Sequence, residues 1–87
     1  MNIFDDVRDA LKEEDPGTYT VLEIAGKLMA ERDKKGISVE ELSKLSGVPK
    51  DVITKIEDGT EVPSLKTVGK LAIALGLKIS VVDEKTI

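Results

Sequence analysis

The stretch SVEELSKLSGVPKDVITKIEDG, residues 38–59, decides the fold of this chain. It opens with Ser38 and has Glu41 three residues later, the pattern in which a helix cap and a carboxylate exchange hydrogen bonds. Gly47 then ends a helix of about two turns, because glycine readily adopts the positive φ of a tight turn. Pro49 fits the first turn of a second helix, where its missing N–H is not needed. The sequence therefore predicts two short helices joined by a turn at Gly47.

Apolar residues on both sides of this turn predict that the two helices pack at a steep angle. We expect Leu42 and Leu45 to form the buried edge of the first helix, and Ile53 and Ile56 to form that of the second. This spacing is typical of a helix-turn-helix, whose second helix can enter the major groove of DNA. The alternative is a helical hairpin that only packs, because a fold does not fix a function.

The flanking sequence predicts two more helices. Thr20 and Glu23 repeat the capping pattern, which favours a helix over about 20–35. An Asp-Pro-Gly run at 15–17 is interpreted as a break before that helix. Another helix is expected over about 64–76, where apolar residues recur at helical spacing.

The C-terminal part alternates apolar and polar residues over 77–82, which predicts a short strand. An edge strand exposes unpaired backbone groups and invites pairing. Leu77, Ile79 and Val81 would share one face, so they are the candidate dimerisation residues of a two-fold homodimer. The alternatives are a frayed tail and addition of the strand to a partner's sheet.

Composition excludes several classes of function. The chain has 87 residues and no cysteine or histidine, which removes disulfides, cysteine zinc sites and the usual general base. No glycine-rich phosphate loop is present either. We therefore expect one small domain that is not an enzyme and that holds no metal or cofactor. No apolar run is long enough to span a membrane and no signal peptide is visible, so we expect a cytoplasmic protein.

The net charge of −4 falls entirely on residues 1–17, which carry six acidic and two basic side chains. Residues 18–87 carry eleven of each and are neutral. The sequence predicts an acidic, helical N-terminal arm over 1–17, a helix-turn-helix domain over 18–76, and a C-terminal strand and tail over 77–87. The arm is interpreted either as a solvated terminus or as a contact surface for a basic partner. The apolar face of the arm consists of Ile3, Phe4, Val7, Ala10 and Leu11.

Beyond these patterns, the chain resembles the Cro/repressor (XRE) helix-turn-helix family over about 24–76. The resemblance implies an all-α, lambda-repressor-like domain that binds double-stranded operator DNA. The stretch 74–81, ALGLKISV, is similar to HigA-type antitoxins, in which the last helix runs into a short strand. The residues that carry the family resemblance are Leu28, Arg32, Gly36, Ile37, Ser38, Leu42, Gly47, Val48, Ile53, Ile56, Glu57, Gly59, Pro63, Ser64, Leu65, Leu71, Ala72, Ala74, Leu75 and Gly76.

The resemblance also implies a set of DNA-binding residues. Ser38 and Val39 would lie against the DNA backbone. Backbone N–H groups near Thr60 and at the start of the Ser64 helix would meet phosphate. The recognition helix would begin at Pro49 and present Lys50, Asp51, Val52, Thr54 and Lys55 outward.

In the same family an arginine before the helix-turn-helix pairs with a glutamate at the end of the recognition helix. Arg32 and Glu57 occupy these positions, so the resemblance implies a structural ion pair; contact of Arg32 with phosphate is the alternative. Residues 20–76 carry nine bases and nine acids. Because phosphate neutralisation dominates DNA affinity, we expect weak binding by one domain and a need for two copies.

These observations together predict a sequence-specific DNA-binding repressor, and more narrowly an antitoxin that neutralises a partner toxin and represses its own operon. The acidic arm, through Ile3, Phe4, Val7 and Leu11, would hold a small basic toxin, or would fold back onto its own domain. The alternatives are a plain XRE-type repressor without a toxin and a protein-interaction module that does not bind DNA.

Overall fold

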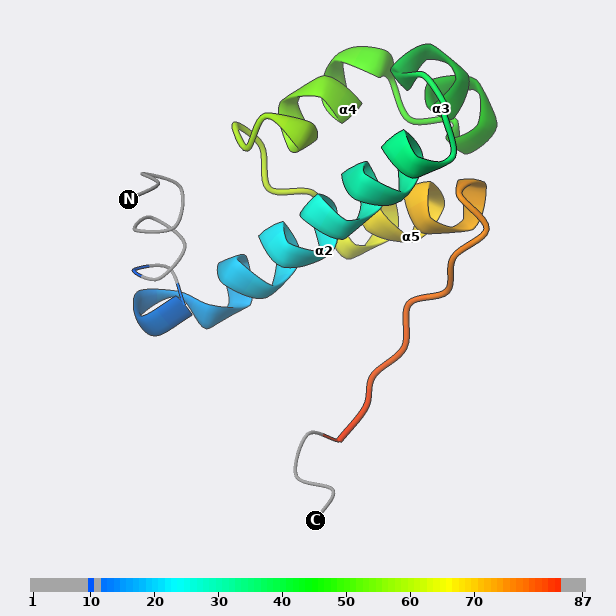
Figure 1. Ribbon diagram of the computed structural model, residues 1–87. Helices are drawn as coiled ribbons and strands as arrows, with labels where there is room; N and C mark the ends of the chain where they lie inside the picture. Colours follow the sequence, from blue (N-terminus) through cyan, green and yellow to red (C-terminus); the bar gives the residue numbers. More distant parts are fainter. Residues whose placement is uncertain (1–9, 11, 84–87) are drawn as a thin grey trace.

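The computed structural model describes residues 10 and 12–83, and its helices are joined by short loops (Figure 1). Residues 10 and 12–14 are also helical. None of the helices in the described part of the chain is long and apolar enough to cross a membrane. The four helices with complete bounds are α2 (Pro16–Lys34), α3 (Val39–Ser46), α4 (Lys50–Glu57) and α5 (Leu65–Ala74).

Helix α2 begins four residues earlier than the sequence predicted. The Asp15 carboxylate accepts hydrogen bonds from the Thr18 backbone N–H at 3.2 Å and from the Thr18 hydroxyl at 2.7 Å. These bonds lower the pKa of Asp15 from its ordinary value, so the cap is ionised at neutral pH. Pro16 occupies the first helical position, where proline is well tolerated. The predicted break therefore lies at Asp15, between the helical residues 12–14 and α2. The predicted cap at Thr20 is wrong, and the Thr20 hydroxyl instead donates to the Pro16 carbonyl at 2.8 Å.

The predicted starts of α3 and α5 are confirmed. The Ser38 hydroxyl accepts from the Glu41 N–H at 3.0 Å, and the Glu41 carboxylate accepts from the Ser38 N–H at 3.4 Å. Ser64 caps α5 by accepting from the Thr67 N–H at 3.2 Å. Gly47 follows α3 with a φ of 76°, a conformation that disfavours residues with a side chain.

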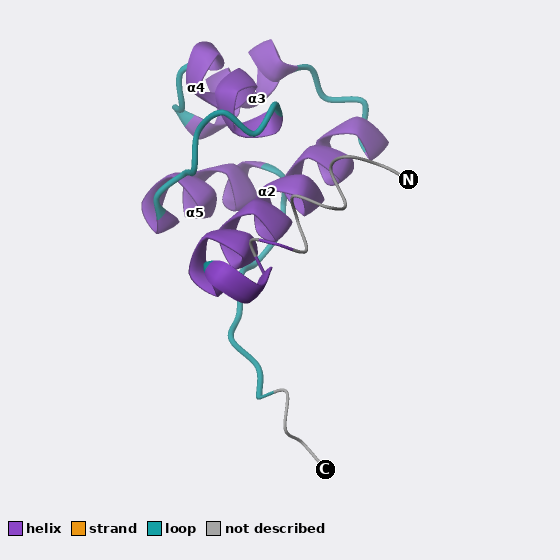
Figure 2. Cartoon of the chain, turned by 90° about the vertical axis from the view of Figure 1, so that its left-hand side faces the viewer, coloured by secondary structure: helices purple, strands orange, loops and turns teal. Residues whose placement is uncertain are grey.

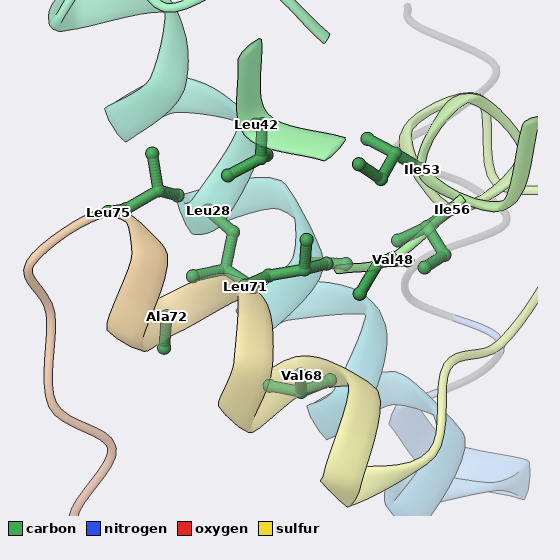
Figure 3. Packing of buried hydrophobic residues seen from close by; sticks show 10 residues of the cluster. Leu28, Leu42, Val48, Ile53, Ile56, Val68, Leu71, Ala72 and Leu75 are labelled. Atoms are coloured by element: carbon green, nitrogen blue, oxygen red, sulfur yellow. The ribbon is translucent and has the colours of Figure 1, made fainter. Parts of the chain in front are cut away.

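One aliphatic core joins the helices (Figure 3). Helix α3 packs against α4 and α5, and α2 packs against the same two helices. Ile53 is only 1% exposed, so the inner face of α4 is buried in the core. The buried hydrophobic residues are Ala25, Leu28, Leu42, Val48, Ile53, Ile56, Val68, Leu71, Ala72 and Leu75.

The predicted C-terminal strand is absent: residues 10 and 12–83 contain no strand (Figure 2). A strand needs a second strand with which to pair its backbone, and the described residues contain no such strand beside this segment. Leu77 still packs against the core, and its N–H donates to the Ala72 carbonyl at 2.8 Å. Beyond it the chain leaves the domain, so that Val81 is 99% exposed. Helices α3 and α4 lie at one end of the molecule and this segment leaves from the other (Figures 1 and 2).

Candidate nucleic-acid interface

The turn between α3 and α4 is fixed by two serine hydroxyls. Ser46 donates to the Leu42 carbonyl at 2.7 Å and accepts from the Val48 N–H at 3.1 Å. Ser43 donates to the Val48 carbonyl at 2.7 Å. Both polar groups of the Val48 backbone are thereby satisfied while its side chain is buried. These serines were not predicted from the sequence, although serine next to a glycine turn favours such side-chain bonds to the backbone.

Helix α4 exposes one face and buries the other. Lys50, Asp51, Thr54 and Lys55 are exposed, as predicted for an outward face. Val52 is only half exposed and packs against the core, so its prediction as an outward residue is wrong. The reason is helical periodicity, which places Val52 beside the buried edge of the helix.

The two lysines of α4 differ in their surroundings. Lys50 Nζ lies 2.9 Å from Glu40 Oε1, and this ion pair joins α4 to the first turn of α3. The hydrogen bond from Lys50 lowers the pKa of Glu40 from its ordinary value, so Glu40 is negatively charged at neutral pH. Lys55 takes part in no ion pair within the described residues.

The residues at the starts of α3 and α4 differ in exposure and in their free hydrogen-bonding groups. Ser38 and Pro49 are exposed, but the hydroxyl of Ser38 already caps α3. Val39 is half buried and packs against the core, so the structure does not place it on an open surface. No side chain caps the first turn of α4, which leaves the backbone N–H groups of that turn open.

Some of the backbone N–H groups expected to contact phosphate after α4 already donate hydrogen bonds within the chain. The Thr60 N–H donates to the Lys55 carbonyl at 2.9 Å and to the Asp58 carboxylate at 3.1 Å. In this conformation the Thr60 N–H is thus bonded within the chain, and the contact of N–H groups near Thr60 with phosphate stays a prediction. Ser64 is exposed and caps α5, whose first turn is accessible.

Arg32 and Glu57 form the expected ion pair. Arg32 Nε and a terminal nitrogen donate to the two Glu57 carboxylate oxygens at 2.7 and 2.9 Å. The other terminal nitrogen donates to the Ile37 carbonyl at 2.8 Å. The side chains are 14% and 16% exposed, and the hydrogen bonds to Glu57 raise the pKa of Arg32. All three guanidinium nitrogens are bonded internally, which argues against the alternative that Arg32 contacts phosphate.

The predicted partner-contact residues are not brought together by the described structure. Ile3, Phe4, Val7 and Leu11 lie outside the described residues. Of the candidate dimerisation residues, Leu77 is half buried, whereas Val81 is almost fully exposed. Leu77 and Ile79 line an open cavity of about 560 Å³ between the C-terminal segment and α2.

This chain belongs to the helix-turn-helix family. Residues 28–82, more than half of its length, match the sequence model of that family. A relative from Haemophilus influenzae, named an uncharacterized HTH-type transcriptional regulator, is 42% identical over 55 residues. The match covers 63% of this chain and 56% of the relative, so the chain spans just over half of the relative's length. A search of solved structures gave no match.

The Arg32–Glu57 pair predicts a large effect on stability. Arg32→Ala leaves a largely buried carboxylate without a partner and is expected to lower the free energy of unfolding by about 3 kcal/mol. Arg32→Lys recovers only part of this loss, because an ammonium cannot bond both carboxylate oxygens and the Ile37 carbonyl in the same planar geometry. Urea unfolding followed by far-UV circular dichroism measures both changes. An unchanged free energy in Arg32→Ala would contradict the structural role.

Proposed function

We propose that the protein is a DNA-binding transcriptional regulator that inserts α4 into the major groove. Three observations support this: the family match, the relative named as a regulator, and an α4 whose outer face is not used by the core. The last observation carries the proposal. Lys50, Thr54 and Lys55 are exposed on a helix held rigidly from within, and side chains of these kinds contact phosphates and base edges.

The charge balance shapes how such a protein would bind. The helix-turn-helix has two lysines on α4 but also Glu40, Asp51 and Asp58 nearby, so these side chains give the DNA-facing surface no net positive charge. Because each neutralised phosphate adds to affinity, a single domain would bind DNA weakly. Repression of a specific operator then requires a second copy on an adjacent half-site.

A single substitution tests DNA binding. Lys55→Ala is expected to weaken binding to a mixed-sequence duplex and to reduce the slope of log K against log salt by about 0.9, because one phosphate contact is lost. Fluorescence anisotropy at increasing KCl concentrations measures both quantities. Lys27→Ala, which removes the same charge from an exposed position of α2, is the matched control. Equal affinities and slopes for the two variants would contradict the groove assignment and favour a protein-interaction module.

We further propose that the regulator is a homodimer joined through its C-terminal segment. Val81 is 99% and Val82 76% exposed, and Ile79 is 37% exposed, so this segment presents apolar side chains to solvent. Backbone groups of an extended segment can pair with a second copy about a two-fold axis. The segment leaves the domain on the side away from α3 and α4, so pairing there leaves α4 accessible (Figures 1 and 2).

Val81→Lys is the sharpest test of this dimer. The side chain is 99% exposed in the single chain, so the substitution leaves the fold intact and acts only on association. Sedimentation equilibrium is expected to show a dimer for the native chain and a monomer for Val81→Lys. Leu65→Lys changes another exposed apolar residue, at the start of α5, and is expected to remain dimeric. A dimeric Val81→Lys protein would place the interface elsewhere.

An antitoxin role is a second proposal, supported by the charge of the N-terminal arm. Residues 1–17 hold the whole net charge of −4 and combine it with apolar residues at helical spacing. A segment of this kind suits an apolar groove on a small basic protein, because charge steers the encounter and the apolar face supplies contact area.

Removal of residues 1–14 tests the antitoxin role and keeps the Asp15 cap of α2. The shortened protein is expected to lose its complex with a basic protein encoded by the adjacent reading frame, and to keep its affinity for DNA. Co-expression followed by size-exclusion chromatography measures the complex. A complex that survives the deletion would contradict the arm contact, and the absence of any complex with the full chain would favour a plain repressor.

A further inference from the structure

The ion pair between Glu40 and Lys50 bridges the two helices of the helix-turn-helix. Glu40 is the second residue of α3 and Lys50 is the first residue of α4. Their charged atoms are 2.9 Å apart, and the side chains are 71% and 58% exposed. The pair therefore lies on the surface, where a competing anion can reach the ammonium group.

We propose that Glu40 occupies the position on Lys50 that a DNA phosphate would take, so that it lowers DNA affinity and flattens its salt dependence. The inference rests on the proposed function, because it concerns the same DNA-binding surface. A carboxylate and a phosphate are both anionic acceptors for a lysine ammonium group. For Lys50 to neutralise a phosphate, the contact with Glu40 has to be broken or shared.

The position of Glu40 adds a direct effect to this competition. The start of α3 is the part of the fold expected to lie against the DNA backbone. A carboxylate released there stays within about one Debye length, roughly 10 Å, of the phosphates and is not fully screened. Lys55 has no ion-pair partner in the described residues, so no carboxylate competes directly with a phosphate for its ammonium group. The two lysines of α4 therefore contribute unequally.

The release of counterions from DNA makes the unequal contributions of Lys50 and Lys55 measurable. A lysine that neutralises one phosphate steepens the slope of log K against log salt by about 0.9, because the phosphate releases its condensed cation. When Lys50 leaves Glu40, the exposed carboxylate gathers cations from solution, which offsets part of that release. In Glu40→Gln this offset is gone, so the slope becomes steeper while the net charge changes by one unit.

The test compares the native chain with Glu40→Gln, Lys50→Gln and the double variant. Binding to a fluorescein-labelled, mixed-sequence duplex of about 30 base pairs is measured by anisotropy at several KCl concentrations. Glu40→Gln is expected to bind about two- to fivefold more tightly at about 0.1 M salt, the range set by exposed ion pairs, and to show a steeper slope. In the Lys50→Gln background the same substitution is expected to give a smaller gain, because only the direct effect of Glu40 on the phosphates is left to remove. Glu23→Gln, an equal charge change at an exposed position of α2, is expected to leave both quantities unchanged.

Three results would overturn the inference while the native chain still binds DNA. They are an unchanged affinity and slope in Glu40→Gln, an equal gain in Glu23→Gln, and a full gain that persists without Lys50. If neither the native chain nor Glu40→Gln binds the duplex at low salt, the proposed function itself fails and this inference fails with it. Circular dichroism confirms that each variant is folded.

Discussion

The orientation of α4 depends on the guanidinium group of Arg32, which bonds two parts of the chain that lie far apart in sequence. It holds Glu57 at the end of α4 and the Ile37 carbonyl just before α3, and it projects from α2. The long helix is thus tied to both ends of the helix-turn-helix by one side chain. Buried ion pairs contribute less to net stability than their Coulomb energy suggests, but they define geometry where apolar contacts are non-directional. The apolar core supplies most of the stability, and the hydrogen bonds of Arg32 help to define the orientation of α4 relative to α2.

The surface of the helix-turn-helix combines a family fold with an unusual charge balance. The fold presents α4 outward, yet the acidic side chains around it reduce its positive potential. Glu40 is the clearest case, because it contacts a lysine of α4 directly. A regulator with such a surface binds non-specific DNA weakly. Non-specific sites then compete less with the specific site, so the specificity ratio is higher. For the proposed regulator, DNA affinity then has to come from specific contacts.

Local rules made part of this structure predictable from sequence. Ser38 and Gly47 act through neighbours within a few residues, so the bounds of α3 could be derived before the structure was known. The break at Asp15 was predictable, but the start of α2 at Pro16 was not, because Asp-Pro-Gly can end one helix and begin the next. The hydrogen bonds that Asp15 accepts from Thr18 start α2 directly after the break. The alternation over 77–82 describes a strand but does not supply the neighbour that a strand requires. The Glu40–Lys50 contact spans two helices, and only their packing brings the charges together.

Pro49 has a consequence for the thermodynamics of recognition. Its ring fixes φ at −56° immediately before α4, so the approach of the chain to that helix is rigid without any side-chain cap. The conformational entropy of this segment is lost during folding rather than on contact with a ligand. Helix α4 is therefore preorganised, and the backbone N–H groups of its first turn are open and oriented. Because no side chain caps these groups, a macromolecular ligand can replace water at them without breaking a side-chain cap.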